Sequence, residues 1–445
     1  MQLPCSTRKR YLTGVDWTVH GLNAMTWRNT GIGNLIEVVF ELADEIDDRL
    51  LVRKMGEFLE SFPVLSGRTV RDWNLCPYWS YSSRVRAATF RFGTQVLEEE
   101  AGEREILEAL AQPSNTPAGS REYLWGRGIR VGRRRWFVVF VFDHRLFDGR
   151  GAEIFLALFQ RWHDARGAED VAHGLPPPEA AHLTDWRRRF AAGQRVLHWY
   201  RNTFPEPCAI ALPTSRHCRG KGFRYRHVGF SEEVSRALFT KVCDGAGYLM
   251  LTPYLLALVA RAMHPVFARR GLAALAYVIP VSTDARPTGK LAETAFFNHM
   301  SFFLFRVAAQ DLANAGRAET SLRRQLYDQM KAGVPRDITA ATMLTRIAPL
   351  ALLARLLPLP TRGQMGSYAF THLGESAFTY SHLLDVPVRN MFHMPRVPHP
   401  PGLGFFFNKY HGRLNGVLSY LSGILSEDEA DETMRRLCES LTVSE

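Results

Sequence analysis

Cysteine is sparse in this 445-residue sequence, and no two cysteines form a Cys-x-x-Cys pair. The six cysteines lie far apart, at positions Cys5, Cys76, Cys208, Cys218, Cys243 and Cys438. Zinc ribbons and disulfide scaffolds need more closely spaced cysteines, so both classes are disfavoured. Scattered free thiols suit a reducing compartment, and we expect a cytoplasmic protein without a metal site.

Long hydrophobic runs are also missing. The first ten residues contain no apolar core of the kind that a signal peptide carries. The longest apolar-leaning segment, residues 347–357, is too short to cross a bilayer and contains Pro349 and Arg355. We therefore expect neither a signal peptide nor a transmembrane helix.

Two functional signatures are absent. The sequence has no Gly-x-Ser-x-Gly elbow, so nothing predicts a nucleophilic serine or a covalent acyl-enzyme. Short arginine clusters occur at 133–135 and 187–189, but no nucleic-acid-binding motif accompanies them. Nucleic acid is therefore disfavoured as a partner.

The net charge of +11 comes mostly from arginine. One interpretation is a general compositional bias toward arginine. Another is an anionic partner, such as the phosphates of coenzyme A or an acidic acyl carrier protein. The charge also permits loose, peripheral attachment to an anionic membrane face.

Length and composition describe an ordinary globular enzyme, with 46% hydrophobic and 22% charged residues. A chain this long exceeds what one core usually fills, so two domains are expected. We predict an N-terminal half over 1–195, a crossover linker rich in proline, glycine and arginine over 196–225, and a C-terminal half over 226–445.

The most informative segment joins a predicted strand to a predicted helix. Residues 136–142 are apolar, β-branched and aromatic, which is typical of a buried strand, and an apolar stripe of helical period follows over 154–162. His144, Asp148 and Gly149 lie between them in a His-x-x-x-Asp-Gly pattern. A histidine at such a junction can project into a cleft, and Gly149 is expected to allow a backbone conformation that a side chain would resist.

This pattern resembles the active-site motif of the acyltransferase superfamily that includes chloramphenicol acetyltransferase, wax ester synthases and peptide-synthetase condensation domains. Residues 10–16, 62–68, 276–286 and 368–374 are similar to other segments of that superfamily. Residues 297–303 resemble the wax ester synthase pattern Gly-Asn-x-x-Ser. The resemblance implies an α/β fold of two chloramphenicol-acetyltransferase-like sandwiches with a tunnel between them.

The sequence also departs from its relatives. Asp143 stands where many of them have a first motif histidine, and Phe297 stands where the wax ester synthases have glycine. The Asp-Phe-Gly-Trp-Gly sequence of the plant subgroup is missing. The subgroup, and with it the substrate, therefore stays open.

The resemblance implies a role for each candidate residue. His144 would be the general base, since a neutral imidazole near pH 7 can take and return a proton. Asp148 would point away from the substrate and pair with Arg286, and Gly149 would let the backbone pass close to the acyl chain or pantetheine arm. Asn298 or Ser301 would donate a hydrogen bond to the oxyanion or hold the acceptor.

The expected reaction moves an acyl group from acyl-CoA or an acyl-phosphopantetheine carrier to an alcohol or amine, including lipid acceptors, without a further cofactor. One alternative is peptide-synthetase-like condensation in trans, because no carrier or adenylation domain is attached. Another is a catalytically silent relative that acts as a binding or assembly protein.

Overall fold

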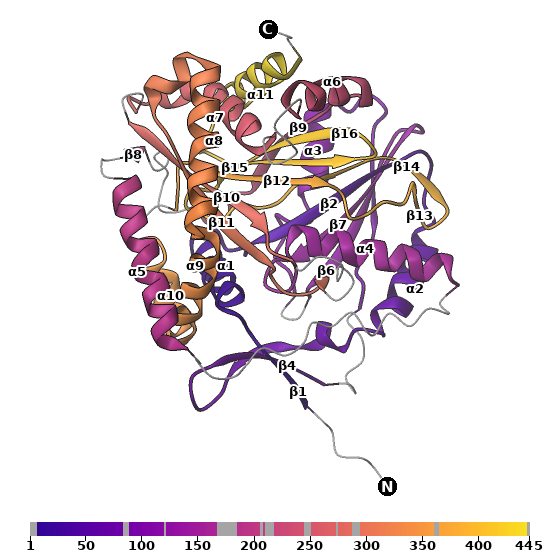
Figure 1. Ribbon diagram of the computed structural model, residues 1–445. Helices are drawn as coiled ribbons and strands as arrows, with labels where there is room; N and C mark the ends of the chain where they lie inside the picture. The colour runs from indigo at the N-terminus through magenta and orange to yellow at the C-terminus, as the bar shows by residue number, and fades with distance from the viewer. Residues whose placement is uncertain are drawn as a thin grey trace.

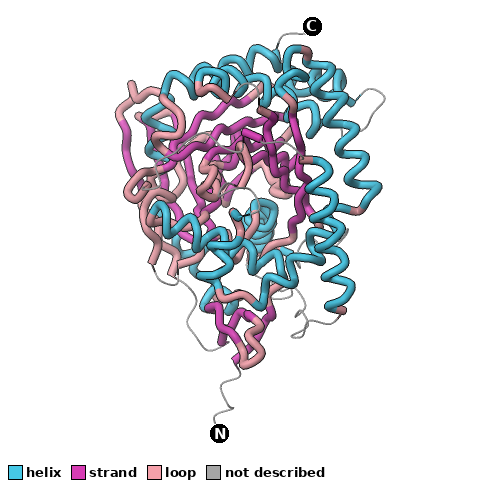
Figure 2. The backbone as a smooth tube through the Cα atoms, turned by 90° about the vertical axis from the view of Figure 1, so that its left-hand side faces the viewer, coloured by secondary structure: helices cyan, strands magenta, loops and turns pink. Residues whose placement is uncertain are grey.

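The computed structural model describes residues 7–82, 89–119, 122–166, 185–204, 208–209, 218–243, 251–272, 275–286, 294–359 and 365–442. Two large β-sheets form the centre of the molecule, and most helices lie around them (Figures 1 and 2). The described helices are α1 (Gly14–Thr30), α2 (Asp48–Leu59), α3 (Glu103–Ala111), α4 (Gly149–Asp164), α5 (Trp186–Thr203), α6 (Glu232–Cys243), α7 (Leu251–Arg269), α8 (Ala315–Ala332), α9 (Val334–Thr342), α10 (Leu350–Leu356) and α11 (Glu427–Thr442). The described strands are β1 (Thr7–Tyr11), β2 (Leu35–Leu42), β3 (Arg68–Arg71), β4 (Pro77–Ser82), β5 (Thr94–Leu97), β6 (Leu124–Val131), β7 (Arg135–Asp143), β8 (Cys208–Ala209), β9 (Phe223–Gly229), β10 (Ala276–Asp284), β11 (Met300–Val307), β12 (Ala369–Glu375), β13 (His382–Leu383), β14 (Val386–His393), β15 (Leu403–Tyr410) and β16 (Arg413–Leu421).

The first sheet has the strand order β13-β14-β2-β7-β6-β5. Its strand β7 confirms the strand predicted at 136–142. Val139 and Val141 pack into one hydrophobic cluster and Phe140 and Phe142 into another, so both faces of β7 are covered. A strand buried on both faces reads as a continuous apolar run rather than an alternating one.

The second sheet has the order β11-β10-β12-β15-β16-β9, and β8 pairs with β10. Strands β10 and β11 are antiparallel, with Asp284 opposite Met300. Strands β15 and β16 form an antiparallel hairpin, with Phe405 opposite Leu418. Helix α11 begins with a capping box at Ser426: its hydroxyl accepts from the N–H of Glu429, whose carboxylate accepts from the Ser426 N–H.

The C-terminal half of the chain contributes a strand to the first sheet. Strand β14, from the C-terminal half, pairs antiparallel with β2 in the first sheet. Helix α5 runs continuously to Thr203 and so crosses the boundary expected at 195/196. Strands from both halves of the chain therefore share the first sheet, and the division into domains stays a prediction.

Helix α7 is long and apolar enough to cross a membrane by length and composition, and the sequence interpretation did not single it out. In the fold, 67% of its most apolar window is buried inside the protein. Leu255, Val259 and Phe267 pack into the large hydrophobic cluster. This helix is therefore a core helix.

A small third sheet, β1-β4-β3, lies away from the two large ones at the lower end of Figure 1. The side chain of Arg71 on β3 ties it to the body of the molecule. Its guanidinium donates to the carbonyl oxygens of Arg346, Ile347 and Ala348, at 2.9, 2.8 and 3.0 Å. These three residues lie just before α10, so the small sheet and α10 are neighbours.

Candidate active site

His144 lies in the short turn between β7 and α4. The strand ends at Asp143, whose carbonyl accepts from the N–H groups of Leu146 and Phe147. The N–H of His144 donates to the carbonyl of Asn34 at 3.2 Å, just before β2 begins. The backbone of the histidine is thus fixed by the first sheet, while its half-buried ring faces a cavity.

Asn298, from the segment before β11, orients the imidazole. Its Nδ2 donates to the carbonyl oxygen of His144 at 3.2 Å and to Oδ1 of Asp16 at 3.4 Å. Both partners are acceptors, so they assign the amide orientation and direct Oδ1 toward Nδ1 of His144, 3.1 Å away. Nδ1 therefore carries the proton, which leaves Nε2 as the basic nitrogen.

Asp16 in turn holds Asn298, and the sequence reasoning did not identify this role. Its Oδ1 accepts from the backbone N–H of Asn298 at 2.9 Å, and its Oδ2 accepts from the N–H of Thr13 at 2.9 Å. Thr13 and Asp16 form the capping box that begins α1. The Thr-x-x-Asp spacing of a capping box can be recognised in the sequence. That spacing alone cannot show that the second carboxylate oxygen of Asp16, Oδ1, reaches residue 298.

The predicted pair of Asp148 and Arg286 is present, and both residues are among those that line the cavity at His144. Nη2 of Arg286 donates to Oδ1 of Asp148 at 2.6 Å, and their side chains are only 4% and 5% exposed. Oδ2 of Asp148 accepts from the N–H of His299 at 2.8 Å. Burial alone would raise the pKa of Asp148, but the charge and hydrogen bond of Arg286 together with the His299 N–H lower it below its usual value. Asp148 is therefore an ionised tie between α4 and the segment around His299.

The conformational role expected of Gly149 is wrong, and Gly151 has the steric constraint instead. Gly149 is not among the glycines with positive φ, and a Cβ there would meet the Leu373 side chain at 3.4 Å, which is ordinary contact. A Cβ on Gly151 would lie 2.5 Å from the carbonyl oxygen of Ala295. The close approach of α4 to residue 295 therefore requires glycine at 151.

Asp143, which replaces the first motif histidine of many relatives, is engaged by Arg145. Nε and Nη2 of Arg145 donate to its two carboxylate oxygens at 2.9 and 2.6 Å. Burial alone would lower the pKa of Arg145, but the charge of Asp143 and its hydrogen bonds raise it. The pair braces the turn that carries His144.

A small cavity of about 110 Å³ lies against His144. Its walls include Gly149 and three further histidines, which are His299, His372 and His393. A larger cavity of about 780 Å³ shares four wall residues with it: Thr283, Asp284, His299 and Met300. Two adjoining cavities therefore lie where the tunnel was expected. The larger one reaches the basic residues Arg188, Arg189 and Arg336.

Ser301 lies on the larger cavity and is not brought to the wall of the small one. Its Oγ donates to the carbonyl of Pro335 at 2.7 Å and accepts from Thr339 Oγ1 at 3.1 Å. Both amide protons of Asn298 are engaged as well. The geometry favours a positioning role for Asn298 over a direct hydrogen bond to an oxyanion.

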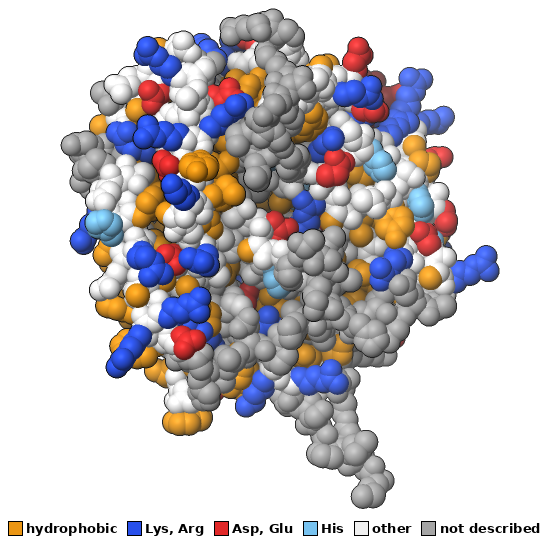
Figure 3. Space-filling model, in the orientation of Figure 1, with side chains coloured by type: hydrophobic (Ala, Val, Ile, Leu, Met, Phe, Trp, Pro, Cys, Tyr) orange, Lys and Arg blue, Asp and Glu red, His pale blue; other side chains and the backbone are white. Residues whose placement is uncertain are grey.

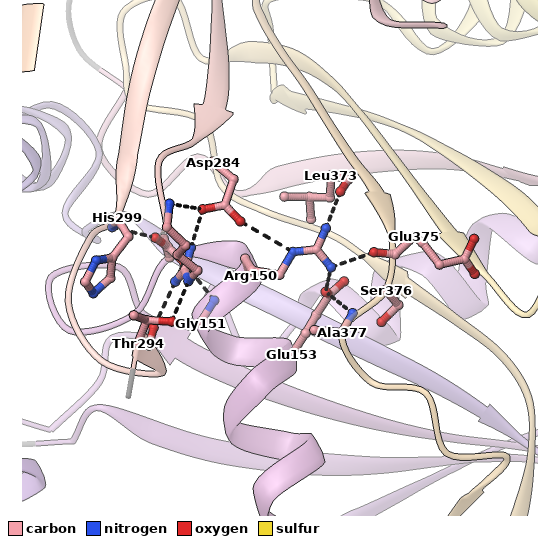
Figure 4. Close-up of polar contacts among 12 residues, drawn as sticks. Arg150, Gly151, Glu153, Asp284, Thr294, His299, Leu373, Glu375, Ser376 and Ala377 are labelled. Carbon is pink, nitrogen blue, oxygen red and sulfur yellow. Dashed lines mark hydrogen bonds and ion pairs between the residues drawn. The ribbon is translucent and has the colours of Figure 1, made fainter. Parts of the chain in front are cut away.

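A buried cluster at the wall of the small cavity was missed by the sequence reasoning. Nε2 of His393, at the end of β14, contacts Oε1 of Glu153 at 2.8 Å, and Arg150 Nη1 donates to Oε2 at 2.7 Å. Burial alone would raise the pKa of Glu153, but Arg150, His393 and the N–H of Ala377 lower it. Arg150 also donates to the carbonyls of Leu373 and Glu375, so it joins α4 to β12 (Figure 4). His393 comes from the strand that crosses between the halves, so no local pattern could have placed it here.

The described residues contain no group of three or more His, Cys, Asp or Glu side chains that could hold a metal ion. The site contains a histidine beside a cavity, with Nδ1 of His144 held by Asn298 and Nε2 as the basic nitrogen. Such a group can act as a general base.

Solved structures match nearly the whole chain, whereas no protein-family model and no curated protein matches it. The trichothecene 15-O-acetyltransferase TRI3 from Fusarium sporotrichioides has a TM-score of 0.69 at 12% identity, over 98% of this chain and 95% of that one. The first condensation domain of the CDA synthetase has a TM-score of 0.64 at 14% identity, over 98% and 95%. The epimerization domain of tyrocidine synthetase B has a TM-score of 0.59 at 14% identity, over 99% and 97%.

At 12–14% identity, these structural similarities show the fold alone. The chain has the fold of condensation domains and of this acetyltransferase, and the expected α/β architecture of two chloramphenicol-acetyltransferase-like subdomains is confirmed.

Proposed function

We propose that this protein is an acyltransferase that moves an acyl group from a thioester to an alcohol or amine, with His144 as general base. One observation carries the proposal. The Nδ1 atom of His144 is engaged by Asn298, and the ring lines a cavity, so Nε2 is the basic nitrogen beside the space where substrates would meet. The fold shared with an acetyltransferase and with condensation domains supports the same reaction class.

In the proposed reaction, Nε2 of His144 takes the proton of the acceptor's hydroxyl or amine as its oxygen or nitrogen attacks the thioester carbonyl. The tetrahedral adduct then collapses, the carbon–sulfur bond breaks, and the imidazolium returns the proton to the departing thiolate. The enzyme forms no covalent bond in this sequence. The donor, acyl-CoA or acyl-phosphopantetheine, is a co-substrate.

Oxyanion stabilisation needs a donor near the reacting carbonyl. Since the protons of Asn298 and Ser301 are engaged, we propose the hydroxyl pair of Ser282 and Thr371 instead. Their oxygens are 2.8 Å apart, and both residues line the small cavity. One proton of such a pair can turn toward a developing negative charge.

Condensation in trans, with both substrates on carrier proteins, is the second candidate. It is favoured by the overlap with the CDA condensation domain along nearly the whole of both chains. A basic approach to the larger cavity, with Arg188, Arg189 and Arg336, suits either the phosphates of coenzyme A or an acidic carrier protein. The two candidates differ in the donor that they consume.

A donor screen tests the proposal. The purified protein is incubated with acyl-CoAs of graded length, and in parallel with the same acyl groups on phosphopantetheinylated carrier proteins, each with a panel of alcohols and amines. Free thiol is measured with a colorimetric thiol assay, and the product is identified by mass spectrometry. We expect acceptor-dependent thiol release from one donor class. If no donor releases thiol faster with acceptors than without, the silent, assembly-protein interpretation replaces the enzyme.

A further inference from the structure

Large apolar side chains are exposed together at one end of the molecule. Eight of the fourteen exposed large hydrophobic residues in the described part of the chain belong to three adjoining segments: the β3–β4 turn, the N-terminal end of α5, and α10 with its flanks. They are Trp73, Leu75, Trp186, Phe190, Ile347, Leu352, Leu356 and Leu359. We name this surface the basic apolar face. Exposed apolar clusters of this kind mark interaction sites rather than random surface.

Contacts join the three segments. Arg71 Nε donates to the carbonyl of Leu75 at 2.7 Å, while the same guanidinium donates to that of Ile347. Arg189 on α5 and Met343, just before Ile347, line the same larger cavity. Figure 1 shows α5, α10 and the small sheet converging at its lower left, where Figure 3 shows hydrophobic and basic side chains interspersed.

Each helix presents an apolar stripe to solvent. On α5, Trp186 is 60% exposed, and Phe190 follows four residues later on the same face. On α10, Leu352 and Leu356 are spaced by four residues, and Leu359 follows just beyond the helix. Trp73, at the tip of the β3–β4 turn, is 90% exposed. Large apolar side chains are mostly buried in folded proteins, so we interpret these exposed stripes as a surface that binds a partner.

Charge decides which partner fits. Helix α5 contains five arginines and no acidic residue, and α10 contains Arg355 and no acidic residue. Strand β1 adds the exposed Arg8 and Lys9. Asp337, a nearby acid on α9, is paired with Arg195 at 2.7 Å. Exposed tryptophan, phenylalanine and leucine among arginines are the composition of helices that lie in the interface of an anionic bilayer.

We propose that the basic apolar face docks this protein on the surface of an anionic lipid bilayer. Asp185, Arg188 and Arg189, at the start of α5, line the larger cavity directly beside Trp186. Docking therefore holds the opening of that cavity at the lipid surface. It follows, and this step alone rests on the proposed function, that the acyl chain or the acceptor is lipid-soluble and enters from the bilayer.

Vesicle binding tests the proposal without any measurement of activity. The full chain is sedimented with vesicles of phosphatidylcholine alone and of phosphatidylcholine with about 30% phosphatidylserine, at low and high salt. We expect binding to the anionic vesicles, weakening as salt rises. The triple variant Trp73→Ser, Trp186→Ser, Leu356→Ser should bind at least about tenfold more weakly.

A second variant separates charge from apolar contact. Replacing Arg187→Gln and Arg188→Gln should lower the affinity for anionic vesicles by about tenfold or more. The matched controls lie elsewhere on the surface. They are Arg53→Gln with Lys54→Gln on α2, and Val96→Ser on the edge strand β5, and they should bind as the unaltered protein does. Melting curves establish that each variant is folded.

Three results would overturn the proposal. One is the absence of binding to anionic vesicles, and another is equal binding by the arginine pair variant and its α2 control. The third is a dimer in light scattering that the triple variant converts to monomer without any vesicle binding, since the face would then join two copies of the chain. A failed donor screen would leave all three measurements unchanged, so the two proposals fail separately.

Discussion

At the scale of single residues, the account depends on which nitrogen of His144 is basic. Asn298 accepts from Nδ1, and Asp16 fixes Asn298 through its backbone N–H. A histidine without such a partner would divide between two tautomers and several ring orientations. The chain therefore uses two contacts in series, from Asp16 to Asn298 and from Asn298 to His144, to aim one reactive atom, as second partners do for catalytic and metal-bound histidines elsewhere.

Replacing Asn298→Ala should lower kcat by up to about 10²-fold, because a base displaced by an ångström loses about that much. The KM for the thioester should change little, since the amide oxygen and nitrogen of Asn298 are both engaged by protein groups. Steady-state kinetics with the best donor from the screen give both values. Ser301→Ala is the control, and its kcat should stay within a few-fold of the unaltered protein.

Two other outcomes would contradict the role assigned to Asn298. If Ser301→Ala loses more kcat than Asn298→Ala, the hydroxyl takes part in the reaction and the assigned positioning role of Asn298 is wrong. If Asn298→Ala raises KM alone, the amide binds substrate directly.

At the scale of elements, the turn between β7 and α4 is fastened to the segment before β11. Asp148 joins Arg286 and the N–H of His299, and Phe297 donates its N–H to the carbonyl of Leu146 at 2.6 Å. Helix α4 approaches this segment so closely that residue 151 has no room for a methyl group. The histidine is thus aimed by elements that are distant in sequence.

The two glycines of α4 provide a matched pair of variants. Gly151→Ala should destabilise the protein by about 1–3 kcal/mol, because its Cβ would overlap a backbone oxygen that cannot move freely. Gly149→Ala should leave the free energy of unfolding unchanged or raise it slightly, since alanine is the better helix former. Urea unfolding of both variants measures the difference. Equal stability of the two would show that the close approach at residue 151 is not a constraint.

At the scale of the whole molecule, two sheets of different strand order meet at the small cavity, and strand β14 crosses from one half to the other. Much of this could be predicted from local pattern. The apolar run of β7, the hairpin of β15 and β16, and the cap at Ser426 are each encoded within about twenty residues. The ion pair of Asp148 and Arg286 was predicted from the resemblance to the acyltransferase superfamily, and its geometry is seen only in the fold.

Other features depend on contacts that no short segment encodes. His393 reaches Glu153 across 240 residues, and Asp16 reaches Asn298 across 282. The steric limit at Gly151 arises from Ala295, so a sequence gives no reason to prefer 151 over 149. The basic apolar face combines three segments, each of which looks like an ordinary amphipathic surface by itself.

In the proposed reaction, His144 moves the proton from the acceptor to the departing thiolate. The most direct measurement is the acceptor-dependent rate of thiol release by His144→Ala, with folding verified by its melting curve. We predict a loss of at least about 10²-fold in kcat, the lower end of what a general base contributes. A folded, pure His144→Ala protein that retains activity within a few-fold of the unaltered chain would contradict the account.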